Sequence, residues 1–187
     1  HQWPYHNMDY ILESTKTMVK RWFWVWGIFL TLSLGFLVLR PSFNLALNGD
    51  DYLGLWRYEI YINGWGGETL TNWSYFFTDY GPMDMLTAAI HHYFGFTPQV
   101  YYIISFIFRS LAALSFLWPV YILTKNKWAS IGAAAFFIIT ATGLEATNWS
   151  FNTPSYLAIV FTNTLLGCFI LSRTRESLLL WILSAVL

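Results

Sequence analysis

The stretch that decides the fold is the first long apolar run, WFWVWGIFLTLSLGFLVL, which occupies residues 22–39. Its length of about 18 residues is close to the minimum that spans a hydrocarbon core of ~30 Å as a helix. The tryptophans at its start suit the boundary between lipid and water, because the indole ring has one polar and one apolar edge. Arg40 and Pro41 end the run, since proline disfavours helix at the residue before it. We therefore expect a first transmembrane helix over residues 22–39.

The composition of the chain also indicates a membrane protein. Of its 187 residues, 56% are hydrophobic and 11% are charged, whereas a soluble domain carries roughly 25% charged residues. The formal net charge is zero, which argues against a nucleic-acid partner. Further apolar runs predict spans over residues 99–124, 128–142 and 154–171, and a truncated fifth over 178–187. The predicted fold is an all-α polytopic membrane protein, with a transmembrane domain over residues 22–187.

Three features of these runs bear on packing and on the extent of the protein. Gly132, Ala133, Ala134 and Ala135 predict a small-residue face that permits close helix packing in the third span. The single cysteine, Cys168, excludes an internal disulfide and fits a small buried side chain. The chain begins at His1 and ends inside an apolar run, so we expect it to be the N-terminal part of a larger protein.

Basic residues predict the orientation. Lys16, Lys20 and Arg21 precede the first run, Lys125 and Lys127 follow the second, and Arg173 and Arg175 follow the fourth. The predicted topology places all of them on one side, and an excess of Lys and Arg in short loops marks the cytoplasmic side. Residues 1–21 are then a cytoplasmic segment of a multi-pass integral protein, which we expect in a bacterial inner membrane.

The long connection over residues 41–98 is then expected to be an outer loop. Amphipathic patterns over residues 52–62 and 84–94 predict two helices. Both are too short to cross the membrane, so we expect them to lie in its interface.

Two adjacent carboxylates, Asp50 and Asp51, follow the outer end of the first run. A carboxylate in this position can accept a proton from an attacking hydroxyl group or bind a divalent cation. The alternative is structural, because the side chain of Asn48 or Asp50 would cap a helix that starts near Tyr52. The residues alone leave both interpretations open.

This layout resembles the GT-C superfamily of glycosyltransferases, polytopic enzymes that take a sugar from a polyprenyl-phosphate carrier. The closest similarity is to the branch of protein O-mannosyltransferases and lipid A aminoarabinose transferases. In that branch an Asp-Glu pair follows the first span, and a Tyr/His-Pro-Pro-like segment precedes the second interfacial helix. The corresponding residues here are Asp50-Asp51 and Tyr80-Gly81-Pro82-Met83, with Asp51 in place of glutamate and only one proline. The resemblance covers residues 22–171, mostly as layout.

The resemblance implies transfer of a sugar from a polyprenyl-phosphate-linked donor to a lipid, glycan or protein acceptor on the outer face. It implies that Asp50 activates the acceptor, and Asp51 is the second catalytic candidate. No cofactor is expected beyond a possible divalent cation. The candidate residues for binding the substrate or its phosphate are Arg57, Arg109, Tyr80, His91 and Glu145.

The two candidate arginines have structural alternatives. Arg57 is close enough in sequence to form a salt bridge with Asp51 or Glu59. Arg109 lies inside a predicted span, where an unpaired charge costs at least ~2.5 kcal/mol at the bilayer centre. It is therefore expected to face the bundle, either in a structural pairing or at the phosphate.

The other candidates have alternatives too. His91 and His92 point about 100° apart on a helix, so they do not form a chelating pair and are otherwise polar interfacial residues. Glu145 would join Asp50 as a second acidic ligand. The segments 68–75 and 145–151 share an Asn-Trp-Ser motif, which either lines a sugar site or reflects the aromatic-rich composition.

A rival function comes from a different class. A non-enzymatic membrane protein, such as a transporter or assembly factor, would use the same acidic outer loop as a folded structural cap.

Overall fold

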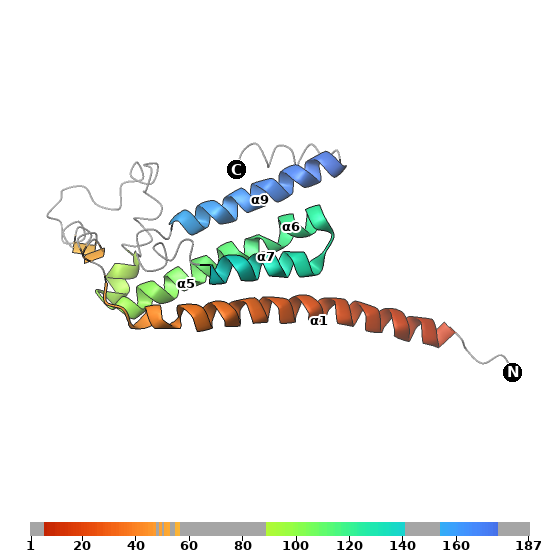
Figure 1. Ribbon diagram of the computed structural model, residues 1–187, viewed down its shortest axis with the longest axis horizontal. Coiled ribbons are helices and arrows are strands. Elements are labelled where there is room, and N and C mark those ends of the chain that lie inside the picture. The colour runs from red at the N-terminus through yellow and green to blue at the C-terminus, as the bar shows by residue number, and fades with distance from the viewer. Residues whose placement is uncertain are drawn as a thin grey trace.

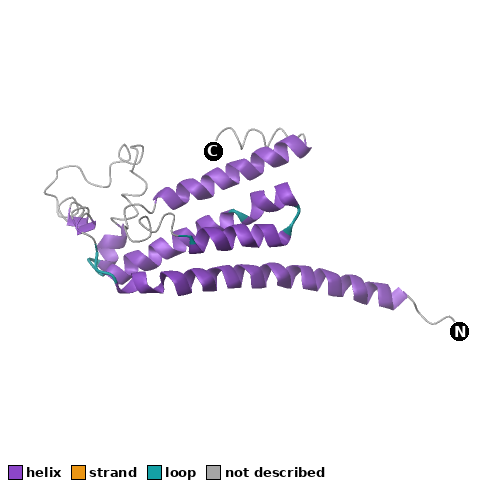
Figure 2. Ribbon diagram, in the orientation of Figure 1, coloured by secondary structure: helices purple, strands orange, loops and turns teal. Residues whose placement is uncertain are grey.

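Helices make up nearly all of the described structure (Figures 1 and 2). The computed structural model describes residues 6–47, 49, 51–52, 55–56, 89–140 and 154–175. Within these ranges no strand occurs, which confirms the predicted all-α fold. The elements are α1 (His6–Leu39), the 3₁₀ helix η1 (Arg40–Asn44), α5 (Pro98–Ser115), α6 (Leu117–Thr124), α7 (Lys127–Ile139) and α9 (Pro154–Arg175).

Three helical stretches in the described part of the chain are long and apolar enough to cross a membrane. They are Trp22–Asn44, Pro98–Thr124 and Ser155–Thr174. Each coincides with a predicted span, so the prediction of a membrane protein with apolar spanning helices agrees with the structure. The fifth predicted span, residues 178–187, lies outside the described residues.

The first helix is longer than its apolar run. α1 already begins at His6 and therefore includes most of the segment expected to lead into the membrane. It ends at Leu39, the boundary that Pro41 predicts. The chain continues as η1, whose start accommodates Pro41 because the first N–H groups of a helix have no intrahelical partner.

The second span is two helices rather than one, with the interruption at Phe116. Pro119 has no N–H to donate to the carbonyl oxygen of Ser115, four residues earlier, and its ring clashes with that carbonyl. The Ser115 hydroxyl donates to the carbonyl oxygen of Ala112 (2.6 Å) and accepts a hydrogen bond from Asn163 Nδ2 of α9 (2.8 Å). The break in the span is thus joined to α9.

The third predicted span is shorter than expected. α7 has 13 residues, which at 1.5 Å per residue gives about 20 Å of helix, against the ~30 Å of a hydrocarbon core. It ends at Ile139 because Thr140 has an extended backbone. α9, in contrast, continues as helix to Arg175, beyond the end of the span predicted over residues 154–171.

The helices pack mainly as α1 on α7, α5 on α7 and α9, and α6 on α7 and α9 (Figure 1). The α1–α7 contact depends on small residues of α1, since a Cβ atom at Gly27 would overlap Ile131 and one at Gly35 would overlap Ile138. Of the small-residue face predicted for the third span, Ala134 is fully buried, but Gly132 does not take part in close packing. Gly132 is exposed and open to space, because α7 turns Ile131 and Ile138 toward α1 instead.

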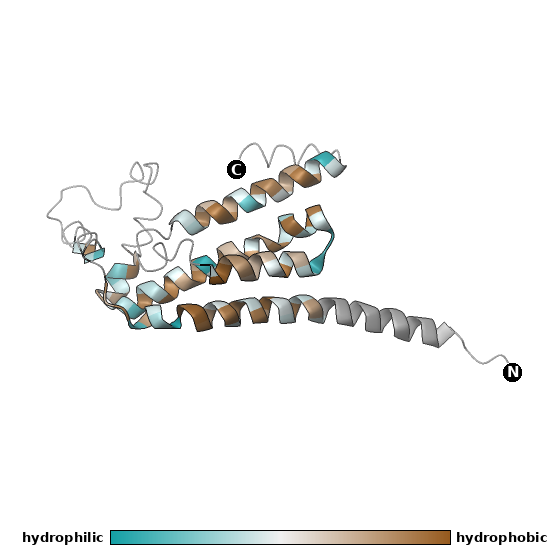
Figure 3. Cartoon of the chain, viewed as in Figure 1, coloured by the Kyte–Doolittle hydropathy of each residue, from teal (hydrophilic) through white to brown (hydrophobic). Residues whose placement is uncertain are grey.

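The bundle has two chemically different ends. The turn between α6 and α7, with Lys125 and Lys127, is hydrophilic and lies near the last turn of α9, which contains Arg173 (Figures 1 and 3). We call this the Lys127 end. The opposite end, the Asp51 end, contains η1, the helical residues near Asp51 and the start of α5. The basic residues after α6 and near the end of α9 therefore share one end, as the topology predicts.

Candidate functional site

The Asp51 end has a small apolar core that holds three separate segments together. Leu47, Leu55 and Tyr101 are buried against one another, and Ile90 packs on them. Leu47 comes from the segment after η1 and Leu55 from the helical residues 55–56. Ile90 and Tyr101 come from the segment that runs from the helical residues 89–94 into α5. Burial of apolar side chains thus fixes the main chain around Asp51 against the start of α5.

His91 lies at the junction of these segments. Its Nδ1 atom is 3.3 Å from the carbonyl oxygen of Gly95 and 3.4 Å from the Tyr101 hydroxyl, which itself donates to Gly95 at 2.7 Å. The tautomer with hydrogen on Nδ1 satisfies this carbonyl. The turn suits glycine, because Gly95 has a φ of +57°. The Phe96 ring lies edge-on to His91 at 4.8 Å, so the imidazole is held on two sides.

Asp51 is fully buried, with 0% of its surface exposed. Its carboxylate interacts electrostatically with Tyr101 and Tyr102. The Tyr102 hydroxyl donates to the carbonyl oxygen of Ala46 at 2.7 Å, which ties α5 to the chain just before Asp51. A buried carboxylate is costly unless polar groups surround it. We call Asp51, His91, Tyr101 and Tyr102 the Asp51 cluster.

Arg109 is also 0% exposed, but it lies on α5 in the middle of the bundle. Its Nε–H donates to the carbonyl oxygen of Ile138 at 3.2 Å, and its Nη2 donates to those of Phe137 (3.4 Å) and Thr140. Its Nη1 donates to the Tyr156 hydroxyl of α9 at 3.1 Å. The guanidinium thus caps the C-terminal end of α7, where the last carbonyl groups lack intrahelical partners and the helix dipole favours a cation.

The position of this cap explains how α7 can end so early. Phe136 already accepts a hydrogen bond from Thr140 N at 3.0 Å, and Arg109 binds the next two carbonyl groups. The guanidinium also lies 5.8 Å from the centre of the Phe137 ring and 6.0 Å from that of Tyr156, in range for cation–π attraction. Arg109 faces the bundle, as expected for a charge within a span, and the described contacts are structural. Its phosphate role stays a prediction.

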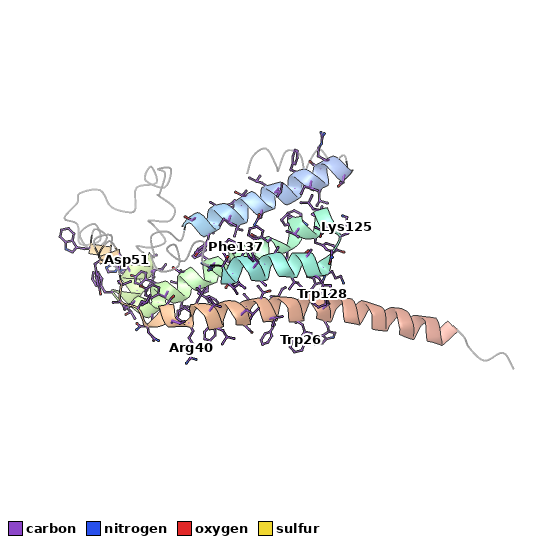
Figure 4. The ribbon with its side chains drawn as sticks, in the orientation of Figure 1. Trp26, Arg40, Asp51, Lys125, Trp128 and Phe137 are labelled. Carbon is purple, nitrogen blue, oxygen red and sulfur yellow. The ribbon has the colours of Figure 1, made fainter. Side chains whose placement is uncertain are left out.

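The structure brings some of the candidate residues together and separates others. Asp51 and His91 are both buried at the same end of the bundle, where His91 lies 3.4 Å from the Tyr101 hydroxyl. Arg109 is apart from them, since the Phe137 ring beside it lies in the middle of the bundle, away from Asp51 (Figure 4). Asp50, Arg57, Tyr80 and Glu145 lie outside the described residues, as does Asn48 of the proposed helix cap.

The structure describes only some residues of the two expected interfacial helices and only some of the possible metal ligands. Residues 89–94 are helical and so are 51–52 and 55–56, within or at the edge of the two predicted helices, whose other residues lie outside the described ranges. His92 is exposed beside Tyr93 rather than paired with His91. Across the ranges that the structure describes, no three His, Cys, Asp or Glu side chains gather as a metal-binding group.

Sequence reasoning missed the tyrosines. Tyr101 and Tyr102 supply the hydroxyl groups of the Asp51 cluster, and Tyr156 supplies the hydroxyl group beside Arg109. A signal was present, because each of these residues follows a proline that opens a helix, Pro98 or Pro154. Tyrosine near the end of a spanning helix has one apolar face and one polar tip, so it suits a polar contact at that depth.

The arrangement of the Asp51 cluster can orient hydroxyl groups and hold a negative charge at one end of an apolar helical bundle. Comparison of the chain with protein-family models, with curated proteins and with solved structures finds no match. The functional argument therefore rests on the residues and their geometry.

Proposed function

We propose that this protein is a membrane glycosyltransferase of the GT-C type, which transfers a sugar from a polyprenyl-phosphate carrier to an acceptor at the Asp51 end. The observation that supports the proposal most directly is the complete burial of Asp51 a few residues after a helix of spanning length, at the end of the bundle where α5 begins. A carboxylate held in one place also fixes the position of the residues next to it in the sequence.

The proposal gives the two aspartates different roles. Asp51, which is covered, is a positioning residue that fixes the segment on α5 through the cluster. Asp50 is the base that takes the proton of the acceptor hydroxyl group. The acceptor oxygen forms a bond to the anomeric carbon, the bond from that carbon to the phosphate oxygen breaks, and polyprenyl phosphate leaves with the electron pair.

The orientation is part of the same proposal. The Asp51 end faces outward from a bacterial inner membrane and the Lys127 end faces the cytoplasm, because the basic residues gather at the latter. The proposal predicts that a reporter enzyme fused after Gly64 lies on the outer face of this membrane. A reporter that is active only in the cytoplasm would contradict this orientation and the placement of the site.

Asp50→Asn is the central test. We expect sugar transfer by membranes that contain the full protein to fall about 10²–10⁴-fold, the usual contribution of a general base. The donors are radiolabelled polyprenyl-phosphate hexoses and pentoses. His92→Gln, at an exposed polar position, is the matched control and keeps the activity. Transfer by the Asp50→Asn variant at the wild-type rate would overturn the assignment.

A second candidate function has its own supporting observation. The rival, a non-enzymatic membrane protein, is favoured by the complete burial of Asp51 and by the bond from Tyr102 to Ala46, which together describe a structural cap. It predicts that Asp51→Asn lowers the unfolding temperature while Asp50→Asn changes neither stability nor the phenotype of a complemented deletion strain. Asp50→Asn is therefore the variant that separates the two functions.

A further inference from the structure

Exposed tryptophans occur near the Lys127 end, and two of them, Trp26 and Trp128, are labelled in Figure 4. Trp22 and Trp26 of α1 are 54% and 62% exposed, and Trp128 at the start of α7 is 72% exposed. Lys125 is exposed at the turn between α6 and α7. Tryptophans at the end of spanning helices lie at the depth of lipid headgroups. We therefore expect this surface to contact phospholipid.

Lys127 is held in a defined place on this surface. Its Nζ atom lies 5.2 Å from the centre of the Phe23 ring and 6.0 Å from that of Trp24, both on α1. The Phe23 ring in turn packs edge-on against Trp128 at 4.8 Å, and Trp24 packs edge-on against Tyr121 of α6 at 5.5 Å. Rings from three helices therefore fix one ammonium group at their junction, at little further cost in side-chain entropy.

The positive charge at this end comes from side chains rather than from the start of α7. Asn126 Oδ1 accepts hydrogen bonds from Trp128 N (2.9 Å) and Ala129 N (3.3 Å), so these main-chain donors already have a partner. Among the residues whose side chains the structure describes, the cations at this end are Arg173 on α9 and the two lysines on either side of Asn126.

We propose that the Lys127 end binds the phosphate headgroup of an anionic phospholipid from the surrounding leaflet. Lys127, held by the rings, and the exposed Lys125 contact the phosphate, and Trp128 packs against the glycerol and the first methylene groups. The site is independent of the proposed sugar transfer, because it lies at the opposite end of the bundle from Asp51.

Spin-label measurements test the site directly. The full chain is placed in phosphatidylcholine vesicles that contain a trace of spin-labelled phosphatidylglycerol or phosphatidylcholine, and the two association constants with the protein are compared. We expect phosphatidylglycerol to be preferred. Lys127→Gln should lower the preference about fivefold, the ratio that corresponds to the ~1 kcal/mol of one lysine near an anionic surface. Lys127→Arg should keep it.

Lys125→Asn is the variant that is safest for folding. Lys125 has a left-handed backbone with a φ of 55°, which asparagine adopts readily. It should lower the preference less than Lys127→Gln, because no ring contact fixes Lys125 among the described aromatic contacts.

Arg40→Gln is the matched control, since Arg40 is an exposed basic residue at the opposite end (Figure 4). It should leave the preference within twofold of wild type. The proposal is overturned if the wild type shows no preference for phosphatidylglycerol, or if Lys127→Gln and Lys125→Asn both leave the preference unchanged. It is also overturned if Lys127→Arg loses the preference as Lys127→Gln does. A loss in Arg40→Gln as large as that in Lys127→Gln would overturn it too.

Discussion

Asp51 and Arg109 are both completely buried charged residues, yet their surroundings differ in kind. Arg109 donates to the carbonyl groups at the end of α7, acceptors that the helix itself leaves unsatisfied. Asp51 lies among tyrosine side chains, and each tyrosine hydroxyl also has a main-chain partner of its own. The charge of Arg109 thus completes a helix, whereas the segments near Asp51 are also joined by the hydrogen bonds of Tyr101 and Tyr102.

This difference predicts where substitutions affect the stability of the protein and where they affect the proposed activity. Removal of Arg109 leaves several buried acceptors without a donor, and that cost does not depend on any substrate. Removal of one group from the Asp51 cluster leaves the remaining bonds in place. We therefore expect the largest effects on folding in the middle of the bundle and smaller ones at the Asp51 end, where the proposed activity would be affected instead.

Arg109→Met should have the largest effect on stability. The variant keeps an apolar side chain of similar length but removes the donors to Ile138, Phe137 and Tyr156. Each buried hydrogen bond to a charged group contributes about 1.5–3 kcal/mol, so we expect a loss of ~3 kcal/mol or more. Thermal unfolding in detergent, followed by circular dichroism, measures the loss.

Arg109→Lys is the matched variant for this cap. It keeps the charge at the end of α7, but an ammonium group cannot reach carbonyl and hydroxyl acceptors as a planar guanidinium does. Its stability should fall between that of wild type and Arg109→Met. An unfolding temperature of Arg109→Met equal to that of wild type would show that the contacts at the end of α7 contribute nothing to folding.

Gly27→Leu should have the next largest effect, because it acts on the packing of the same part of the bundle. A side chain at Gly27 overlaps Ile131 of α7, and forced overpacking of this kind costs about 1–3 kcal/mol. Gly132→Leu adds the same side chain at a glycine with open space around it. Its unfolding temperature should therefore stay close to wild type. Equal losses from the two variants would mean that α1 and α7 are not closely packed.

Much of the fold was predictable from the sequence. Long apolar runs bounded by prolines or basic residues predict spans, because the membrane accepts a polar main chain only in helices or closed barrels. Residues 22–39 and 154–171 illustrate this. α7 was predicted too long, since Thr140 and the residues after it looked apolar enough to continue. The bond that allows the early end comes from Arg109 on another helix, which a local pattern does not show.

The site was less predictable for the same reason. Its carboxylates and the inward-facing Arg109 were recognisable, because charges are rare in apolar runs. Their partners were not. The tyrosines of the Asp51 cluster lie roughly fifty residues from Asp51 in sequence, and only packing at the start of α5 brings them to it. The glycines that matter for the α1–α7 contact were also misplaced, because a run of small residues does not say which face meets a neighbour.

Tyr101→Phe should have the smallest of the three effects on stability and tests the Asp51 end. It removes the hydrogen bond of 2.7 Å to the carbonyl oxygen of Gly95, while the His91 ring still lies 3.3 Å from that oxygen. We expect a loss of ~1 kcal/mol, or about 2–4 °C in unfolding temperature for a chain of this size.

Tyr93→Phe, at an exposed position nearby, is the control and should show no change. A loss for Tyr101→Phe as large as that for Arg109→Met would contradict the comparison, because the cluster would then be as essential to folding as the cap. A loss confined to about 1 kcal/mol would show that the Asp51 cluster contributes little to stability. A loss of sugar transfer by Asp50→Asn would then be interpreted as a loss of activity rather than of folding.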